Sequence, residues 1–547
     1  MLRAMPYFRF LMRSSAKPIL AVAVYILLWL LLHSVFQYLL DSDATAYLTI
    51  AEQAAKGNWQ RSVNGLWSPL NGWLLVPFIK MGFQPWMIAK VLNAVVGGVV
   101  LLLAYKLIVR FDEKTKIAPY LLWVLPVVLV YYAYYQIFGD LMQVAFALGY
   151  FLLLTSKGFF GSWPKIISAS ILMGIGFYAK AYSLPFFILH FSACLFFAWR
   201  QNEISLGRAL QSALVAFATI VLLVLPWSFQ LQEKYGEFSL TGFAGKLNMS
   251  WYINSGKSFK SDIDLIIPPV YDDAVSFWED PYLTQEGLVS PTTSSHHFKR
   301  WVLRVGHTTL TYLLCTMRIS IFYLPFLLMG LFALYKRKHK NLKATYILLG
   351  IFILPLGYLM MHIETRYIWL STFLMMAYGA WFIQGKLDAS KSKNWMWMLF
   401  AISFLIYPIY NGYQMRYKNK ELFDLADELN TKGFEGKFVS NPSAEGDLWV
   451  VAYLTKTQNY TIEQSRFVNE DLIAEMQGFG VENFLYFKEG KGQLNMQPEI
   501  EEGVELILTK ESIASAADSI GHFVLEDSLS ALPAQWYRLK SGLSPKP

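Results

Sequence analysis

The chain has 547 residues, of which 55% are hydrophobic and 16% are charged, and its formal net charge is +8. This composition excludes an ordinary soluble enzyme and is typical of an integral membrane protein. The lysines and arginines gather in short connections between apolar runs, as membrane topology requires, so the positive charge does not indicate nucleic-acid binding. The two cysteines, Cys194 and Cys315, lie in separate apolar runs and predict neither a disulfide nor a thiolate metal site.

The apolar runs predict about eleven transmembrane helices, because each crossing of a ~30 Å hydrocarbon core needs about 20 residues. Four basic residues precede the first run and no small-residue cleavage site follows it, which predicts a retained helix with a cytoplasmic amino terminus. The expected helices are 18–40, 86–107, 117–135, 140–155, 166–179, 183–199, 209–229, 308–335, 344–361, 367–384 and 395–411.

Clusters of lysine and arginine occupy every second connection between these helices. The pattern predicts that the segments at about 41–85 and 230–307, together with the carboxy-terminal tail, lie outside the cytoplasm. We therefore expect a mainly α polytopic membrane module over residues 1–411. A small extracytoplasmic α/β domain is expected over residues 412–547, because short helices and strands alternate there in a manner typical of a parallel sheet.

The first outer segment begins with two carboxylates, Asp41 and Asp43, directly after an apolar run, in "LLDSDATAYLTIAEQ". Acidic groups at a membrane boundary are typical of sites that contact water, a cation or a substrate. The same residues could instead start the outer helix, where a carboxylate caps free amides and favours the helix dipole. The spacing leaves both interpretations open.

Three further groups are expected on the same outer face. Asp140 begins the fourth predicted helix, Lys180 falls in the turn between the fifth and sixth, and Arg366 begins the tenth. A phosphate would favour such cations, and arginine in particular for its forked geometry. The alternatives are a helix-start carboxylate for Asp140, a snorkelling lysine, and a surface ion pair of Arg366 with Glu364.

His296 and His297 lie outside near other basic residues and could contact anionic headgroups or a lipid phosphate. No histidine or cysteine spacing resembles a zinc motif.

The quoted first segment, continued by "NGLWSPLNGWLLVPF", resembles the first outer loop of GT-C glycosyltransferases. The likeness is greatest to bacterial members near the protein O-mannosyltransferase and aminoarabinose transferase group. The segments "GIGFYAKAYSLP" and "ETRYIWLSTFL" are similar to later segments of that superfamily and follow in the same order. The resemblance covers roughly residues 18–411.

This resemblance implies a multi-helix membrane module with an outer cavity and a polyprenyl-phosphate-linked sugar as donor. The superfamily's catalytic aspartate falls on Asp41 or Asp43, and its second acidic residue corresponds to Asp140. We favour Asp43 as the base, because Tyr47 and the residues after it fit the family's spacing better, and Asp41 would then orient or bind. The tail lacks the tryptophan-tryptophan-aspartate motif of oligosaccharyltransferases, which argues against asparagine-linked glycosylation.

The residues and the resemblance together predict a glycosyltransferase that moves a sugar from a polyprenyl-phosphate donor to the hydroxyl of a lipid, glycan or protein. Arg366 and Lys180 would hold the donor phosphate, and a divalent cation such as Mg²⁺ or Mn²⁺ could share that role. The resemblance places the protein in a bacterial inner membrane. The rival interpretations are a transporter or lipid flippase and a non-catalytic envelope assembly protein.

Overall fold

The computed structural model describes residues 16–112, 117–254, 266–284, 287–336, 341–387, 393–440, 445–462, 470–487, 523–529 and 534–539. Within this part of the chain, helices occupy all eleven ranges predicted to cross the membrane. They are α2 (Ala16–Phe36), α6 (Pro85–Phe111), α7 (Ala118–Tyr135), α8 (Asp140–Leu154), α9 (Trp163–Ala179), α10 (Ser183–Arg200), α11 (Leu206–Tyr235), α13 (Ser295–Ile319), α14 (Tyr323–Tyr335), α15 (Leu342–Ile353), α16 (Leu356–Leu359), α17 (Trp369–Leu387), α18 (Lys393–Ser403) and α19 (Ile406–Gln414).

Seven spans in the described residues are long and apolar enough to cross a bilayer, and an eighth is added if the bent pair α13 and α14 counts as one crossing. The protein is therefore a polytopic integral membrane protein, as predicted. The remaining helical ranges were expected as crossings from local hydropathy, but the helices in them are short or less apolar; α8, for example, has 15 residues.

The prediction of a single helix over 308–335 is wrong in its start and in its continuity. α13 starts earlier, at Ser295, and the chain bends by 109° before α14 begins. Ser320 stands at this bend in extended conformation, and its hydroxyl accepts a hydrogen bond from the backbone N–H of Phe322 at 3.1 Å. Because the residues on both sides of the bend are apolar, hydropathy alone does not reveal it.

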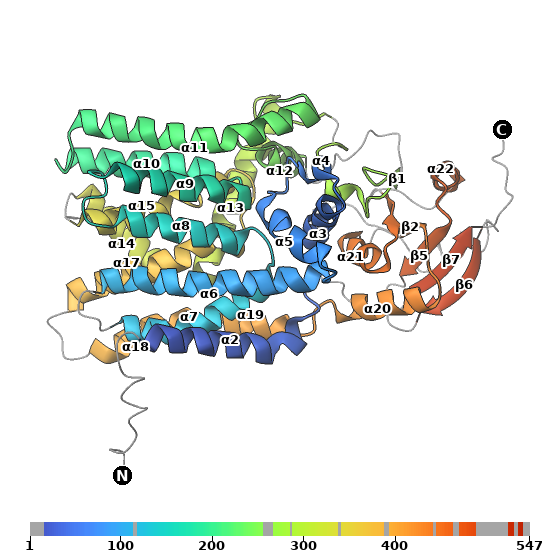
Figure 1. Ribbon diagram of the computed structural model, residues 1–547, viewed down its shortest axis with the longest axis horizontal. Coiled ribbons are helices and arrows are strands. Elements are labelled where there is room, and N and C mark those ends of the chain that lie inside the picture. Colours follow the sequence, from blue (N-terminus) through green and yellow to red (C-terminus); the bar gives the residue numbers. More distant parts are fainter. Residues whose placement is uncertain are drawn as a thin grey trace, which may run out of the picture. The chain divides into compact units, whose positions relative to one another are not determined.

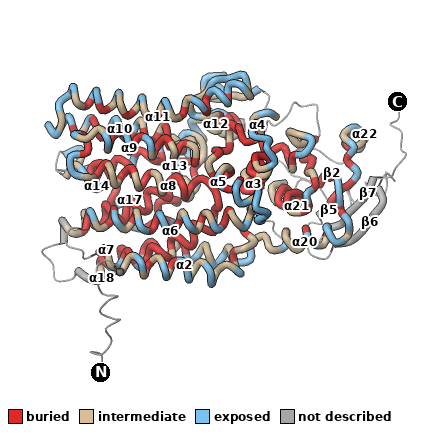
Figure 2. The backbone as a smooth tube through the Cα atoms, viewed as in Figure 1, coloured by how far each residue is buried: buried red, intermediate tan, exposed pale blue. Residues whose placement is uncertain are grey.

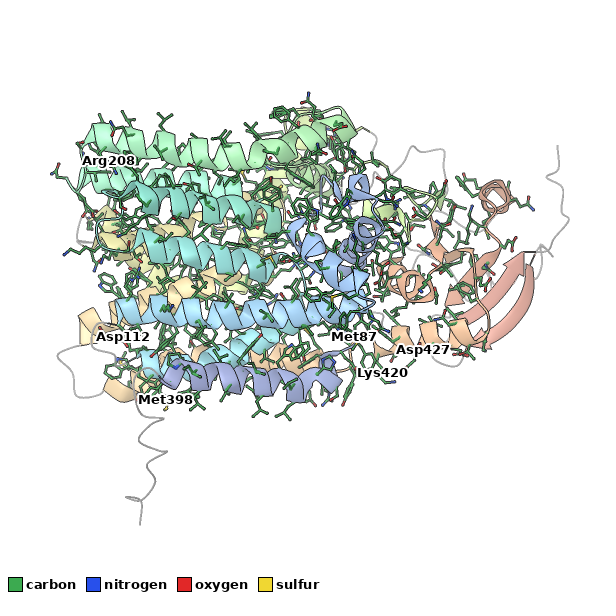
Figure 3. All side chains as sticks on the ribbon, in the orientation of Figure 1. Met87, Asp112, Arg208, Met398, Lys420 and Asp427 are labelled. Carbon is green, nitrogen blue, oxygen red and sulfur yellow. The ribbon has the colours of Figure 1, made fainter. Side chains whose placement is uncertain are left out.

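The interior of the helical bundle contains α7, α8, α15 and α17, whose residues are mostly buried, whereas α2 and α11 keep one exposed side (Figures 1 and 2). The side-chain amide of Asn93 joins α6 to the end of α7 by donating to the carbonyl oxygens of Ala133 and Gln136, at 2.7 and 2.9 Å. Asp112 and Arg208 lie at one end of the bundle and Met87 lies at the other (Figure 3).

The chain divides into two compact units, each made of three separate segments. The first unit contains the helical bundle with α4 (Trp59–Ser62), α5 (Leu70–Lys80) and α12 (Ala244–Ile253). The second unit contains the tail from Tyr417, but also Tyr38–Gln53 and Lys257–Gly287. Parts of both outer segments, including most of α3 (Ser42–Ala55), therefore group with the tail rather than with the bundle.

The tail forms a five-stranded sheet in the order β3-β2-β5-β7-β6. β2 pairs in parallel with β3 and β5, but β7 pairs antiparallel with β5 and β6, so the sheet is mixed rather than parallel as expected. The strands are β2 (Lys437–Ser440), β3 (Gln458–Asn459), β5 (Asn483–Phe487), β6 (Phe523–Leu529) and β7 (Ala534–Leu539), and the helices of the tail are α20 (Lys420–Thr431), α21 (Glu445–Thr455) and α22 (Glu470–Phe479).

A second small sheet holds the outer segment to the tail within the same unit. β1 (Ile266–Ile267) pairs antiparallel with β4 (Thr461–Ile462). The isoleucines of this pair are buried. The backbone N–H of Ile266 also donates to the carboxylate of Glu475 in the tail, at 2.9 Å. Both contacts hold the outer segment to the tail.

Candidate functional site

A buried ion pair connects the start of α8 with the end of α9 in the first unit. Asp140 is the first residue of α8 and follows Gly139, which has a positive φ of 51°. Lys180 directly follows α9 in extended conformation, and its ammonium group binds the carboxylate of Asp140. The exposed fractions of the two side chains are 21% for Lys180 and 8% for Asp140, so this pair is shielded from bulk water.

Aromatic rings surround the ammonium group of Lys180. Its Nζ atom lies 4.1 Å from the centre of the Tyr367 ring and 5.8 Å from that of Tyr358. Burial lowers the pKa of Lys180 below the ordinary value of 10.5, and although the negative charge of Asp140 opposes this effect, the nearby charge of Arg366 adds to it. Lys180 is therefore a cation held in a weakly solvated position.

Glu364 and Arg366 form a second ion pair, at the 3₁₀ turn before α17. The Nε atom of Arg366 lies 2.9 Å from Oε2 of Glu364, and its Nη2 atom donates to Oε1 at 3.2 Å. The hydroxyl of Tyr367 also donates to Oε1, at 3.3 Å. Burial would raise the pKa of Glu364, but the charge of Arg366 and the hydrogen bonds from His362 and Arg366 outweigh it and lower this pKa well below its usual range.

Arg304 of α13 extends this cluster, and sequence analysis did not identify it as a site residue. Its Nη2 atom lies 3.2 Å from Nδ1 of His362, and its Nε atom donates to the carbonyl of Met361 at 3.2 Å. Because a guanidinium only donates, Nδ1 of His362 accepts, and the Nε2–H of His362 donates to Glu364 at 3.2 Å. No sequence signal relates Arg304 to a histidine 58 residues away.

The two leading aspartates begin α3, in the second unit. Asp41 caps the helix, since its Oδ1 atom accepts a hydrogen bond from the backbone N–H of Ala44 at 2.8 Å. Asp43 lies in the first turn, and its Oδ1 atom accepts from the indole N–H of Trp278 at 3.3 Å. The structure thus gives Asp41 the capping role that was one of the two interpretations, and gives Asp43 a side-chain partner.

Trp278 is in turn fixed by the tail. Its ring stacks on that of Trp449 in α21, with ring centres 5.2 Å apart and an interplanar angle of 22°. The far end of α3 is also held by α21, because the hydroxyl of Tyr453 donates to Glu52 at 2.8 Å. Sequence analysis missed both tryptophans, because pattern alone does not distinguish a packed tryptophan from an interfacial one.

The remaining predicted residues lie at helix starts. Tyr47 is half-buried in the second turn of α3. His296 and His297 lie in the first turn of α13, where Nδ1 of His297 is 2.9 Å from the hydroxyl of Ser294, the capping residue. Among the described residues, no group of three or more histidine, cysteine or acidic side chains is arranged to hold a metal ion. The expected divalent cation remains a prediction.

The structure thus joins Asp140, Lys180, Glu364 and Arg366 in the first unit, although they come from three separate parts of the chain: the start of α8, the end of α9 and the 3₁₀ turn before α17. Asp41 and Asp43 belong to the second unit. The first group offers cations set among carboxylates and aromatic rings, which suits an anionic ligand. The second offers a carboxylate at the start of a helix, oriented by an indole donor.

No protein-family model matches the chain, and no curated protein matches it by sequence. Solved structures do match. The oligosaccharyltransferase of Archaeoglobus fulgidus in the apo form has a TM-score of 0.53 and 12% identity, with 88% of this chain and 70% of that chain covered. The same archaeal enzyme in complex with an inhibitory peptide and a dolichol-phosphate has a TM-score of 0.51 and 13% identity, with 87% and 69% covered.

ArnT from Cupriavidus metallidurans bound to undecaprenyl phosphate has a TM-score of 0.52 and 11% identity, with 96% of this chain and 99% of that chain covered. The archaeal oligosaccharyltransferase and ArnT are both GT-C proteins. The chain therefore has the GT-C fold, as its sequence resemblance predicted.

Proposed function

We propose that the protein is a membrane glycosyltransferase that transfers a sugar from a polyprenyl-phosphate donor to an acceptor hydroxyl outside the cytoplasm. The observation that carries the proposal is the cluster of Asp140, Lys180, Glu364 and Arg366, which presents shielded cations in a GT-C fold. Two of the structures that share this fold are bound to a dolichol-phosphate and to undecaprenyl phosphate. The proposed location is a bacterial inner membrane, on the basis of the sequence resemblance, and the proposed orientation has the tail outside the cytoplasm, on the basis of the lysine and arginine clusters.

In this proposal Arg366 and Lys180 bind the donor phosphate. Each already faces a carboxylate, which fixes its position before the donor arrives. As the bond between the sugar and the phosphate breaks, the leaving phosphate gains negative charge that these cations stabilise. Mg²⁺ or Mn²⁺ could add to that stabilisation, and chelation of the membranes followed by re-addition of each ion tests this requirement.

Asp43 is the proposed general base. It accepts the proton of the acceptor hydroxyl while that oxygen attacks the anomeric carbon and the lipid phosphate leaves. Assistance of this kind contributes about 10²–10⁴-fold to a rate. Asp41 is the poorer candidate, because it has the structural role of capping α3 through the backbone N–H of Ala44, whereas Asp43 binds a side chain, the indole of Trp278.

The test is transfer of radiolabelled sugar from a panel of polyprenyl-phosphate donors, in membranes containing wild-type or variant protein. Asp43→Asn should reduce transfer by at least about 100-fold, since an amide cannot act as the base. Asp41→Asn is the matched control and should keep most of the activity, because asparagine caps a helix about as well as aspartate.

Equal losses in the two variants would contradict the assignment of Asp43 as the base. If wild-type membranes use no donor although the protein is intact, the transporter or assembly interpretations replace the proposed function.

A further inference from the structure

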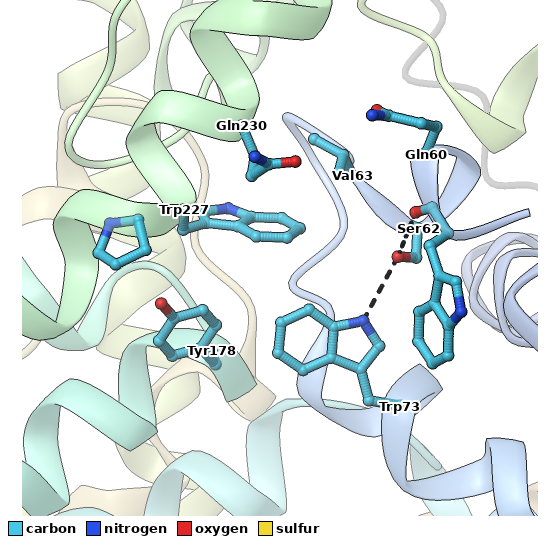
Figure 4. A pocket seen from close by; sticks show the side chains of 9 residues that line it. Gln60, Ser62, Val63, Trp73, Tyr178, Trp227 and Gln230 are labelled. Carbon is cyan, nitrogen blue, oxygen red and sulfur yellow. Dashed lines mark hydrogen bonds between the residues drawn. The ribbon is translucent and has the colours of Figure 1, made fainter.

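A cavity of about 290 Å³ lies in the first unit, among α4, α5, α9 and α11 (Figure 4). Four of the nine residues that line it are aromatic: Trp59, Trp73, Tyr178 and Trp227. Polar atoms come from two glutamines and a serine, and no charged side chain is among the lining residues. The cavity thus offers aromatic faces and neutral hydrogen-bonding groups together.

The aromatic wall is built before any ligand arrives. Trp73 meets Trp227 edge to face, with ring centres 5.7 Å apart and an angle of 80°, and it lies 5.7 Å from Tyr178. The phenol of Tyr178 is anchored to α11, because it donates to the carbonyl of Leu223 at 2.7 Å. These contacts keep the rings in place, so ligand binding does not have to order them.

The polar side of the cavity comes mainly from α4. The hydroxyl of Ser62 donates to the carbonyl of Trp59 at 2.7 Å and accepts from the indole N–H of Trp73 at 3.4 Å (Figure 4). Gln60 of α4 and Gln230 of α11 also line the cavity, and both are exposed (Figure 4). Each amide can donate and accept, although one N–H of Gln230 already donates to Glu233 at 3.5 Å.

We propose that this cavity binds an uncharged sugar ring. One face of such a ring carries C–H groups, which pack on the electron-rich face of an indole, and its edge carries hydroxyls, which the amides and Ser62 can meet. The volume lies at the lower end of the range for ligand pockets, about 300–1,000 Å³, and suits a single ring rather than a long prenyl chain. The lining residues include no cation for a phosphate, and the ammonium group of the neighbouring Lys234 binds the carbonyl oxygen of Val63.

The position of the cavity relates this inference to the proposed function, on which it rests. Tyr178 lines the cavity, and Lys180 of the ion pair follows two residues later. The backbone N–H of Ala181 is held by the hydroxyl of Ser68, at 3.1 Å, in the loop between α4 and α5. The cavity and Lys180 thus share the end of α9, although the ammonium group itself faces Asp140 and not the cavity. The sugar ring would belong either to the donor or to a glycan acceptor.

The test is saturation-transfer NMR on the full-length protein in nanodiscs, with methyl hexosides as probes. Choline and geraniol are tested in the same way, as a cationic and a prenyl alternative to the sugar. Trp59→Ala and Gln230→Ala are suitable variants, because both side chains are exposed and their loss should not disturb folding. Trp199→Ala is the matched control, since Trp199 is 38% exposed on α10 and does not line the cavity.

We expect a methyl hexoside to bind the wild-type protein and the Trp199→Ala control. Its affinity should fall about threefold to tenfold in Trp59→Ala, the range for losing one aromatic contact. The inference is overturned if no hexoside binds, if Trp59→Ala leaves binding unchanged, or if choline or geraniol gives the signal that depends on Trp59.

A transfer assay on the same variants identifies the source of the sugar. A higher KM for the donor in Trp59→Ala indicates the donor's sugar, whereas a higher KM for the acceptor indicates a glycan acceptor. The two proposals fail separately: hexoside binding without transfer from any donor would contradict the proposed function alone. Transfer with neither KM changed in the variants would contradict this inference alone.

Discussion

Lys180 shows how the surroundings of one residue set its chemistry. In an exposed position a lysine ammonium would stay charged far into the alkaline range, but Lys180 is packed between two tyrosine rings and close to Arg366. Burial and that neighbouring charge lower its pKa, although Asp140 partly restores it. Its charge, and any phosphate binding that depends on it, is therefore lost at lower pH than for an ordinary lysine.

We predict an alkaline limb in the donor kcat/KM of the wild-type protein, beginning below pH 10.5, because the lowered pKa of Lys180 belongs to the free enzyme. Lys180→Arg should move this limb to higher pH, since a guanidinium stays protonated. Initial rates at limiting donor across the pH range provide the measurement. An identical limb in both proteins would assign the titration to a different group.

Arg366 makes a different contribution, because its guanidinium is planar: Nη2 donates to Glu364 at 3.2 Å, and Nε lies 2.9 Å from the same carboxylate without forming a hydrogen bond. We predict that Arg366→Ala raises the donor KM by at least about tenfold, while Arg366→Lys recovers only part of this loss, because an ammonium lacks the planar, forked donors with which a guanidinium binds a phosphate. Donor titrations at saturating acceptor would separate KM from kcat. Full recovery in Arg366→Lys would show that only the charge matters.

At the scale of elements, the short helix α16 supports the turn that carries Lys180. The hydroxyl of Tyr182 donates to the carbonyl of Leu354 at 2.8 Å and accepts from the N–H of Gly357 at 3.1 Å. A Cβ atom at Gly357 would overlap the Tyr182 ring, which also packs against Tyr358 with ring centres 4.1 Å apart. The glycine is therefore required for the close approach of the two elements.

We predict that Gly357→Ala lowers the free energy of unfolding by about 1–3 kcal/mol, the usual cost of overpacking, and reduces transfer by displacing Tyr182. Gly306→Ala in α13 is the matched control, because nothing lies within 4 Å of its added Cβ atom. Alanine in a helix interior should leave stability equal or raise it by up to about 1 kcal/mol. Thermal melts of the purified proteins test both, and equal melting temperatures would contradict the steric argument.

At the level of the whole molecule, the tail forms one compact unit with parts of the two outer segments. Residues 38–53, which include the proposed base, and residues 257–287 belong to the same compact unit as the tail. The contacts inside this unit are specific: Trp278 stacks on Trp449, and Tyr453 binds Glu52. The tail therefore supports the segment that carries Asp43.

We predict that removing residues 417–547 abolishes transfer while the remaining chain still inserts into the membrane, because each apolar helix satisfies its own backbone hydrogen bonds. Tyr453→Phe in the full chain is a milder test. It removes one hydrogen bond to a carboxylate, usually worth about 1.5–3 kcal/mol, and should reduce transfer without abolishing it. Transfer assays with quantified membrane protein would decide, and an active truncated chain would refute a supporting role for the tail.

The amino-acid sequence was sufficient to predict a polytopic membrane protein, the ranges of its membrane helices, alternating helices and strands in the tail, and Asp41 and Asp43 at a helix start. These features depend on apolar length, periodicity and capping, which are local properties of the chain. The bend between α13 and α14 and the antiparallel strands β6 and β7 were not predicted, because packing decides them.

Only the tertiary structure placed Asp140 against Lys180, Arg304 against His362, and Trp278 against both Asp43 and Trp449. Each of these contacts joins residues at least 40 positions apart in the chain. Such contacts form where helices and loops pack together, so the spacing of residues along the sequence does not predict them. The residue types suggested a site for an anionic lipid. The packing of the helices determines which neighbouring side chains orient the charged groups of that site.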